Sequence, residues 1–209
     1  YPPFYRAAEY PDMIRTTSFY PSAEDVEKGK VPFGFAISTR QAEMLKSLMK
    51  EGKSVQVHAK IDAEFYNGTL DVLTAQITGA EKPDEEVVLI AHLCHYVSCS
   101  NDNASGSGTI IEVARAIKSL IEVGKIARPK RTIRFFWVPE ITGTFFWMHR
   151  HPDKVKGQIV AINLDMVGEH PVHCGRPLNL VQVPDSIPNC LNDLLAYLLD
   201  YVADNPKGI

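Results

Sequence analysis

Residues 86–95 read Glu-Val-Val-Leu-Ile-Ala-His-Leu-Cys-His, and residues 100–108 read Ser-Asn-Asp-Asn-Ala-Ser-Gly-Ser-Gly. The run of apolar and β-branched residues predicts a buried central strand. The strand carries His92 and His95 to its C-terminal end, which is where open α/β sheets bind their ligands. The polar loop that follows adds the carboxylate of Asp102 ahead of a long helical pattern. Histidine and aspartate side chains at one strand end are suitable ligands for a divalent metal ion.

After this strand the sequence alternates between helical and strand patterns. In order, we expect a helix over 109–123, a strand over 132–138, a helix over 145–150, a strand over 158–168 and a helix over 190–202. Such alternation indicates an α/β fold in which mainly parallel strands form a central sheet with helices on its faces.

The first part of the chain has a different pattern. Residues 1–30 have turn signals and no regular period. We expect, in order, a strand over 32–38, a helix over 40–50 capped by Ser38 or Thr39, and strands over 55–61 and 70–77 joined by an Asn67-Gly68 turn. A division at residue 82 into a small β-rich domain (1–82) and an α/β domain (83–209) follows from this change.

Composition excludes several classes of partner. The chain has 209 residues, 45% of them hydrophobic, and a net charge of −3, so neither nucleic acid nor an anionic membrane is expected as a partner. No apolar run approaches the roughly 20 residues of a membrane span, and no signal-peptide pattern occurs. Four cysteines without a CxxC pair favour reduced thiols in a cytoplasmic protein, with a disulfide-containing secreted protein as the alternative. We expect a fragment of a longer protein, and the sequence does not indicate its oligomeric state.

Two further carboxylates follow predicted strands. Glu140 comes after Phe-Phe-Trp-Val-Pro, and Asp165 lies within Ile-Asn-Leu-Asp-Met-Val. A carboxylate in an apolar strand is costly to bury without a cation or a strong donor. Three consecutive strand ends with such residues therefore predict a metal or acid–base site.

These segments, taken in order, resemble the zinc-dependent aminopeptidase family. The resemblance rests on His92 at a strand end, the Asn-Asp-Asn-Ala-Ser-Gly loop at 101–106, a strand followed by Glu140 and then Gly143, and Asn-Leu-Asp-Met at 163–166. It covers 85–209 well. Residues 30–80 resemble the end of the protease-associated domain that is often inserted in these enzymes. The resemblance implies a three-layer sandwich of the phosphorylase/hydrolase-like kind and one or two zinc ions.

The resemblance also implies roles for individual residues. Asp102 corresponds to the carboxylate that bridges two zinc ions, and Asp165 to a ligand of one of them. The histidine ligand of the other ion corresponds to His92 by its strand position, or to His95 by the Cys-His pattern of a related branch. We slightly favour His95. Glu140 is the general base in the register set by Gly143, or a zinc ligand if the alignment has a one-residue gap. The family's last histidine ligand is expected beyond residue 209.

The sequence differs from the family pattern where the family has two adjacent glutamates, because Pro139 precedes Glu140 here. We expect a metallo-aminopeptidase that acts on peptides with a free N-terminus by metal-activated water. The alternatives are a catalytically inactive binding module with the peptidase fold, and a zinc amide hydrolase or cyclase with a non-peptide substrate.

Overall fold

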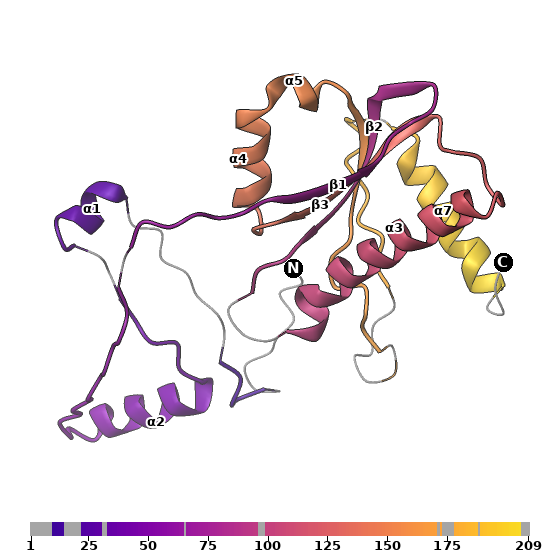
Figure 1. Cartoon of the computed structure of the whole chain (residues 1–209). Helices are drawn as coiled ribbons and strands as arrows, with labels where there is room; N and C mark the ends of the chain where they lie inside the picture. The colour runs from indigo at the N-terminus through magenta and orange to yellow at the C-terminus, as the bar shows by residue number, and fades with distance from the viewer. Residues whose placement is uncertain are drawn as a thin grey trace. The chain divides into compact units, whose positions relative to one another are not determined.

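The computed structural model describes residues 10–14, 22–30, 33–64, 66–95, 99–170, 172, 178–187 and 189–205. The chain divides into two compact units, Tyr1–Tyr66 and Asn67–Ile209 (Figure 1). All five candidate site residues belong to the second unit.

The first unit contains two helices, α1 (Ala23–Glu27) and α2 (Thr39–Lys50). The expected helix over 40–50 is confirmed, and Ser38 is its cap: the Ser38 hydroxyl accepts a hydrogen bond from the Gln41 N–H, and the Gln41 side chain accepts one from the Ser38 N–H. This reciprocal arrangement stabilises the first helical turn.

The predicted strand over 55–61 is wrong, and so is the strand over 32–38 in its described part, residues 33–38. An alternating pattern makes a strand only when a partner strand and an apolar surface are available. Val57 is 79% exposed, and residues 73–77, part of the expected hairpin partner, pair elsewhere. No separate β-rich domain appears in the described residues ahead of residue 73. The domain boundary at residue 82 stays a prediction.

The second unit is built on a four-stranded mixed sheet in the order β1-β3-β2-β4. The strands are β1 (Leu73–Ile77), β2 (Lys82–His92), β3 (Arg131–Val138) and β4 (Gln158–Asn163). Strand β2 pairs in parallel with both β3 and β4, which confirms the parallel arrangement predicted from the alternation. Strand β1 adds an antiparallel edge to β3, so the sheet is mixed.

Helices follow the strands as expected. They are α3 (Gly106–Glu122), α4 (Thr142–Arg150), α5 (Pro152–Val155) and α7 (Leu191–Asp204), which confirms the three predicted helices with shifted ends. Among the described residues, no helix combines the length and apolar character needed to span a bilayer.

Neighbouring phenylalanines of β3 form the core on the two faces of the sheet. Phe135 packs with Ala91 and with Ile110 of α3, whereas Phe136 packs with Val88 and is met by Trp147 of α4. Because successive strand residues point to opposite faces, α3 and α4 cover opposite sides of the sheet. Burial of each phenylalanine contributes about 1.5–3 kcal/mol. The sheet is thereby held so that its strand ends have fixed positions.

Candidate metal centre

The candidate residues meet at one edge of the sheet because their strands are parallel. His92, the last residue of β2, is paired with Val138 of β3, so Glu140 follows two residues beyond that pair. Ile90 of β2 is paired with Asn163 of β4, so Asp165 also follows two residues beyond its strand end. This is the carboxyl edge at which open α/β sheets bind ligands.

The loop that carries Asp102 is fixed by Asn103. The Asn103 side chain is only 4% exposed, and its Nδ2 donates a hydrogen bond to the Leu164 carbonyl (2.9 Å). Its Oδ1 accepts hydrogen bonds from the N–H groups of Gly106 (3.0 Å) and Met166 (3.3 Å). The loop and the segment after β4 are therefore joined on both sides of Asp165.

Asn101 and Ser105 make a second set of links to the same segment. Asn101 Oδ1 accepts a hydrogen bond from the Gly168 N–H (3.0 Å), and the Ser105 hydroxyl accepts one from the Val167 N–H (3.1 Å). Ser105 in turn donates to the Asn101 carbonyl (2.7 Å). Asn101, Asn103 and Ser105 together hold Asp102 near Asp165.

The start of α3 approaches the segment that follows β4 so closely that residue 106 must be glycine. A Cβ atom at Gly106 would lie 2.1 Å from the Leu164 carbonyl oxygen and 2.5 Å from Asn103 Oδ1. Real Cβ contacts are never this short, and glycine is the residue that permits such an approach.

Backbone strain occurs directly after two of the candidate carboxylates. Ile141, which follows Glu140, has φ of 55°, and Met166, which follows Asp165, has φ of 51°. A non-glycine residue in this left-handed region costs on the order of 1–3 kcal/mol and persists where the surroundings impose it. Such strain concentrates at functional sites.

His92, Asp102 and Asp165 form a compact cluster. His92 Nε2 lies 2.9 Å from Asp102 Oδ1 and 3.5 Å from Asp165 Oδ1, and one potential ligand atom from each residue fits within 4.8 Å of the others. The His92 side chain is only 5% exposed, whereas those of Asp102 and Asp165 are 36% and 37% exposed. The cluster is anchored on its buried side and open on the other.

The two ring nitrogens of His92 have different surroundings. Its Nδ1 lies 2.9 Å from the Cys94 carbonyl, which can only accept a hydrogen bond, so Nδ1 carries the proton. Its Nε2 is buried and has no aligned hydrogen-bond partner among the described residues, despite the nearby Asp102 oxygen. The buried Nε2 and two carboxylate oxygens thus lie close together, and a bound cation would satisfy all three groups. A carbonyl that orients a histidine ring in this way is typical of metal sites.

His95 contacts the other oxygen of Asp102, with Nε2 3.4 Å from Oδ2. Each carboxylate oxygen of Asp102 therefore faces a different histidine. This geometry is compatible with the bridging role expected for Asp102. His92 lies close to Asp165 as well, whereas we expected the histidine ligand and Asp165 to bind different ions. The choice between His92 and His95 as the ligand stays a prediction.

Glu140 is exposed and, among the described residues, is not part of the three-residue cluster. Its backbone N–H lies 3.0 Å from the sulfur of Cys94, which ties the end of β3 to the residues after β2. Its assignment as general base or as metal ligand stays a prediction.

Sequence reasoning did not identify the residues that position the cluster. Asn103, Asn101, Ser105 and the Cys94 carbonyl lie in the same quoted stretch as the ligands, but only the three-dimensional pairing with residues 164–168 gives them a role. A buried asparagine flanking a predicted ligand is the signal that points to Asn103. The three cysteines that the structure describes, Cys94, Cys99 and Cys190, are free thiols, and the cytoplasmic location stays a prediction.

The fold and this cluster define an α/β protein with a candidate histidine–carboxylate metal site at the carboxyl edge of its sheet. Residues 14–174 match the family described as "Domain of unknown function (DUF4910)". The chain belongs to this family.

Two curated proteins are similar to part of the chain. One is a Clostridium acetobutylicum protein named "Putative polysaccharide biosynthesis protein with aminopeptidase-like domain", 31% identical over 109 residues, which are 52% of this chain and 23% of that protein. The other is carboxypeptidase Q of Rattus norvegicus, 31% identical over 116 residues, which are 54% of this chain and 24% of the relative. The similarity thus spans about a quarter of the length of either relative.

A crystal structure of a "putative peptidase" from Clostridium acetobutylicum is also similar. It is 26% identical, and the match covers 65% of this chain and 28% of that chain with a TM-score of 0.46. Distant sequence similarity to a protein named for an aminopeptidase-like domain and to a carboxypeptidase accompanies the candidate metal site.

Proposed function

We propose that this chain supplies the metal-binding part of a zinc-dependent aminopeptidase. The observation that carries the proposal is the buried Nε2 of His92, which has no aligned hydrogen-bond partner among the described residues and lies 2.9 Å from one carboxylate oxygen and 3.5 Å from another. One histidine nitrogen and carboxylate oxygens, with open positions left for water and substrate, are the donors of a catalytic zinc site. The distant similarity to peptidases gives independent support.

In this proposal His92, Asp102 and Asp165 would hold one ion, and His95, whose Nε2 lies 3.4 Å from the other oxygen of Asp102, would be a ligand of a second. A bound zinc ion lowers the pKa of water to about 7 and polarises a carbonyl oxygen. Glu140 accepts the water proton and delivers it to the leaving amine, which contributes roughly 10²–10⁴-fold. The substrate is a peptide with a free N-terminus.

Elemental analysis of the purified protein, paired with hydrolysis of an aminoacyl 4-nitroanilide, tests this proposal. We expect one to two zinc ions per chain and hydrolysis of the free-amino substrate but not of its N-acetylated form. Asp102→Asn should lower zinc affinity by at least about 10–100-fold, the loss caused even by removing the groups that orient metal ligands. Asp200→Asn, an exposed aspartate of α7, is the matched control and should change neither quantity.

A catalytically inactive binding module is the second candidate. It is favoured by Pro139, which replaces one of the two adjacent glutamates of the resembled family, and by the position of Glu140 outside the three-residue cluster. Folded protein that stays free of zinc when zinc is added would contradict the enzyme proposal and favour this module. A zinc-loaded protein that cleaves amides other than peptides would instead favour the amide hydrolase alternative.

A further inference from the structure

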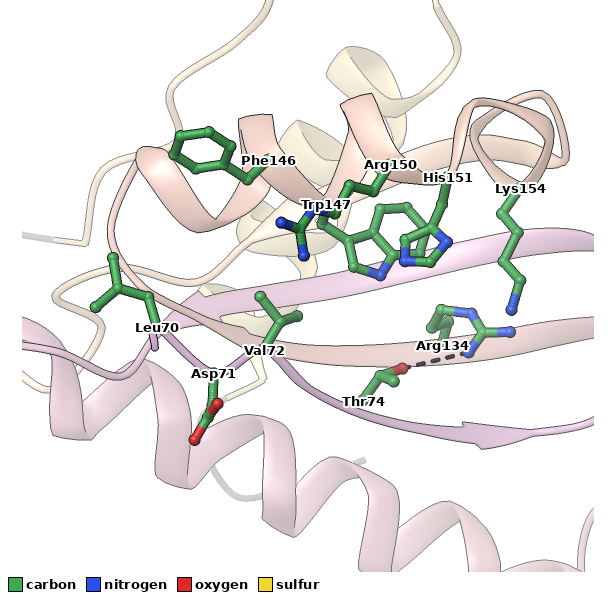
Figure 2. A pocket seen from close by; sticks show the side chains of 10 residues that line it. All are labelled: Leu70, Asp71, Val72, Thr74, Arg134, Phe146, Trp147, Arg150, His151 and Lys154. Atoms are coloured by element: carbon green, nitrogen blue, oxygen red, sulfur yellow. Dashed lines mark hydrogen bonds between the residues drawn. The ribbon is translucent and has the colours of Figure 1, made fainter. Parts of the chain in front are cut away.

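A pocket of about 420 Å³ lies on the face of the sheet that α4 covers, away from the metal cluster. Its floor is formed by strand residues such as Thr74 and Arg134, and its roof by Trp147, Arg150 and neighbouring residues of α4 and α5 (Figure 2). None of its lining residues belongs to the cluster of His92, Asp102 and Asp165. The pocket is therefore a separate site.

Positive charge is in excess in this pocket. Three of the lining side chains, Arg134, Arg150 and Lys154, are cationic. Arg134 is neutralised by the carboxylate of Glu86, with its Nε 2.8 Å from Oε2. Arg150 and Lys154 form no ion pair in the part of the chain that the structure describes, since the acid beside Lys154, Asp153, is paired with Lys156. Two cations without a counter-charge among the described residues thus line the pocket, with the head of Arg150 toward Phe146 and that of Lys154 toward Arg134 in Figure 2.

The acid that lines the pocket, Asp71, does not offset this charge. In Figure 2 its carboxylate points away from the helix that carries Arg150, whereas Lys154 extends from α5 toward Arg134. A cationic group over a surface with low polarity attracts an anion more strongly than the same group in bulk water does.

The other part of the pocket is aromatic and apolar. The Trp147 ring packs edge-on against Phe136 with a centroid distance of 4.7 Å and lies 5.0 Å from the ring of His151. Phe146 and Val72 extend this wall in Figure 2. Because Trp147 is held by its neighbours, it offers a fixed face for stacking at little entropic cost.

We propose that this pocket binds a small organic anion with an aromatic body. The ring stacks on Trp147, and the anionic group, a carboxylate, sulfonate or phosphate, contacts Arg150 or Lys154, whose charged heads lie on either side of Trp147 in Figure 2. Ligand pockets commonly combine an apolar wall with a few convergent polar groups and have volumes of about 300–1,000 Å³. This binding is independent of the metal centre and of the proposed peptidase activity.

Titration with naphthalene-2-sulfonate at low salt tests the proposal. Heteronuclear NMR follows the indole N–H signals of the two tryptophans, of which Trp147 lines the pocket and Trp137 packs on the α3 side. We expect the Trp147 signal to shift with saturation while the Trp137 signal stays in place. Neutral 2-naphthol should bind at least about tenfold more weakly because it lacks the charge-assisted contacts.

A charge-matched pair of variants locates the anion contacts. Arg150→Gln/Lys154→Gln should weaken sulfonate binding at least about tenfold and leave 2-naphthol binding unchanged. Lys125→Gln/Arg128→Gln removes the same charge at exposed positions outside the pocket and should have no effect. All four positions are exposed, so the folded state should persist, which circular dichroism verifies.

Three results would each overturn the proposal. They are a Trp147 signal that does not respond to the sulfonate, equal affinity for the sulfonate and 2-naphthol, and equal weakening by the two double variants. If inorganic sulfate alone bound as tightly as naphthalene-2-sulfonate, the aromatic part of the proposal would be wrong.

Discussion

Asn103 Nδ2 donates a hydrogen bond to the carbonyl oxygen of Leu164 across a distance of 2.9 Å. The two residues are 61 positions apart in the chain. One precedes α3 in the loop that carries Asp102, and the other precedes Asp165 after β4. This contact therefore sets the spacing of the two carboxylates in the candidate metal centre.

Asn103→Ala should destabilise the fold and weaken metal binding together. The substitution leaves the Leu164 carbonyl and the N–H groups of Gly106 and Met166 without their partner, and each buried group left unsatisfied costs about 1–3 kcal/mol. Urea unfolding measures the stability, and a zinc titration measures the affinity. Asn67→Ala, at an exposed position, is the control. Wild-type zinc affinity in the Asn103 variant would refute the positioning role.

Two glycines of α3 make a matched pair for testing close packing. Gly106→Ala should destabilise the protein, because the new Cβ would lie 2.1 Å from the Leu164 carbonyl oxygen. Gly108→Ala has no atom within 4 Å of the new Cβ and should stabilise the helix by up to about 1 kcal/mol. Thermal unfolding of both variants gives the comparison, and effects of the same sign would contradict the packing argument.

The parallel part of the sheet could be predicted because its signals are local. Long apolar runs alternate with helical patterns, and such alternation permits few topologies. The convergence of His92, Asp102 and Asp165 followed from the same reasoning, since parallel strands end at one edge. Neither prediction required knowledge of a long-range contact.

The features that the sequence did not predict depend on contacts between residues that are far apart in the chain. Asn67-Gly68 is a strong local hairpin signal, but Leu73 is paired with Trp137 of β3, so the predicted partner strand at 55–61 has nothing to pair with. The periodicity of a strand also does not determine its last residue. Strand β2 ends at His92, so His92 belongs to the strand whereas His95 lies in the loop that follows it.

Glu85 provides a prediction about pH. Hydrogen bonds from Lys82 and then from Arg131 hold the pKa of the Glu85 carboxyl below its usual value. Because the pKa is lower in the folded state, the stabilisation is present above the ordinary glutamate pKa of about 4.3 and is lost as the pH falls through the lower, folded value. In carbon-13 NMR titrations, Lys82→Gln should raise the pKa of Glu85, whereas Lys156→Gln should leave it unchanged. An ordinary glutamate titration in the wild-type protein would disprove this expectation.

The ion pair between Glu86 and Arg134 should be worth far more than the exposed pairs. Two hydrogen bonds join the groups, from Nε to Oε2 at 2.8 Å and from Nη2 to Oε1 at 2.5 Å, and the side chains are only 10% and 12% exposed. Arg134→Met would leave the Glu86 carboxylate uncompensated, and we expect it to lower the free energy of unfolding by about 3–5 kcal/mol.

Arg115→Met serves as the control for this pair, because Arg115 and Glu112 are 65% and 61% exposed and should contribute less than about 1 kcal/mol. The double variant Glu86→Leu/Arg134→Met removes both charges, so it should recover much of the stability lost in Arg134→Met. Urea unfolding of the single and double variants measures both quantities. A loss in Arg134→Met no larger than that in Arg115→Met would mean that solvent screens the buried pair as well as the exposed one.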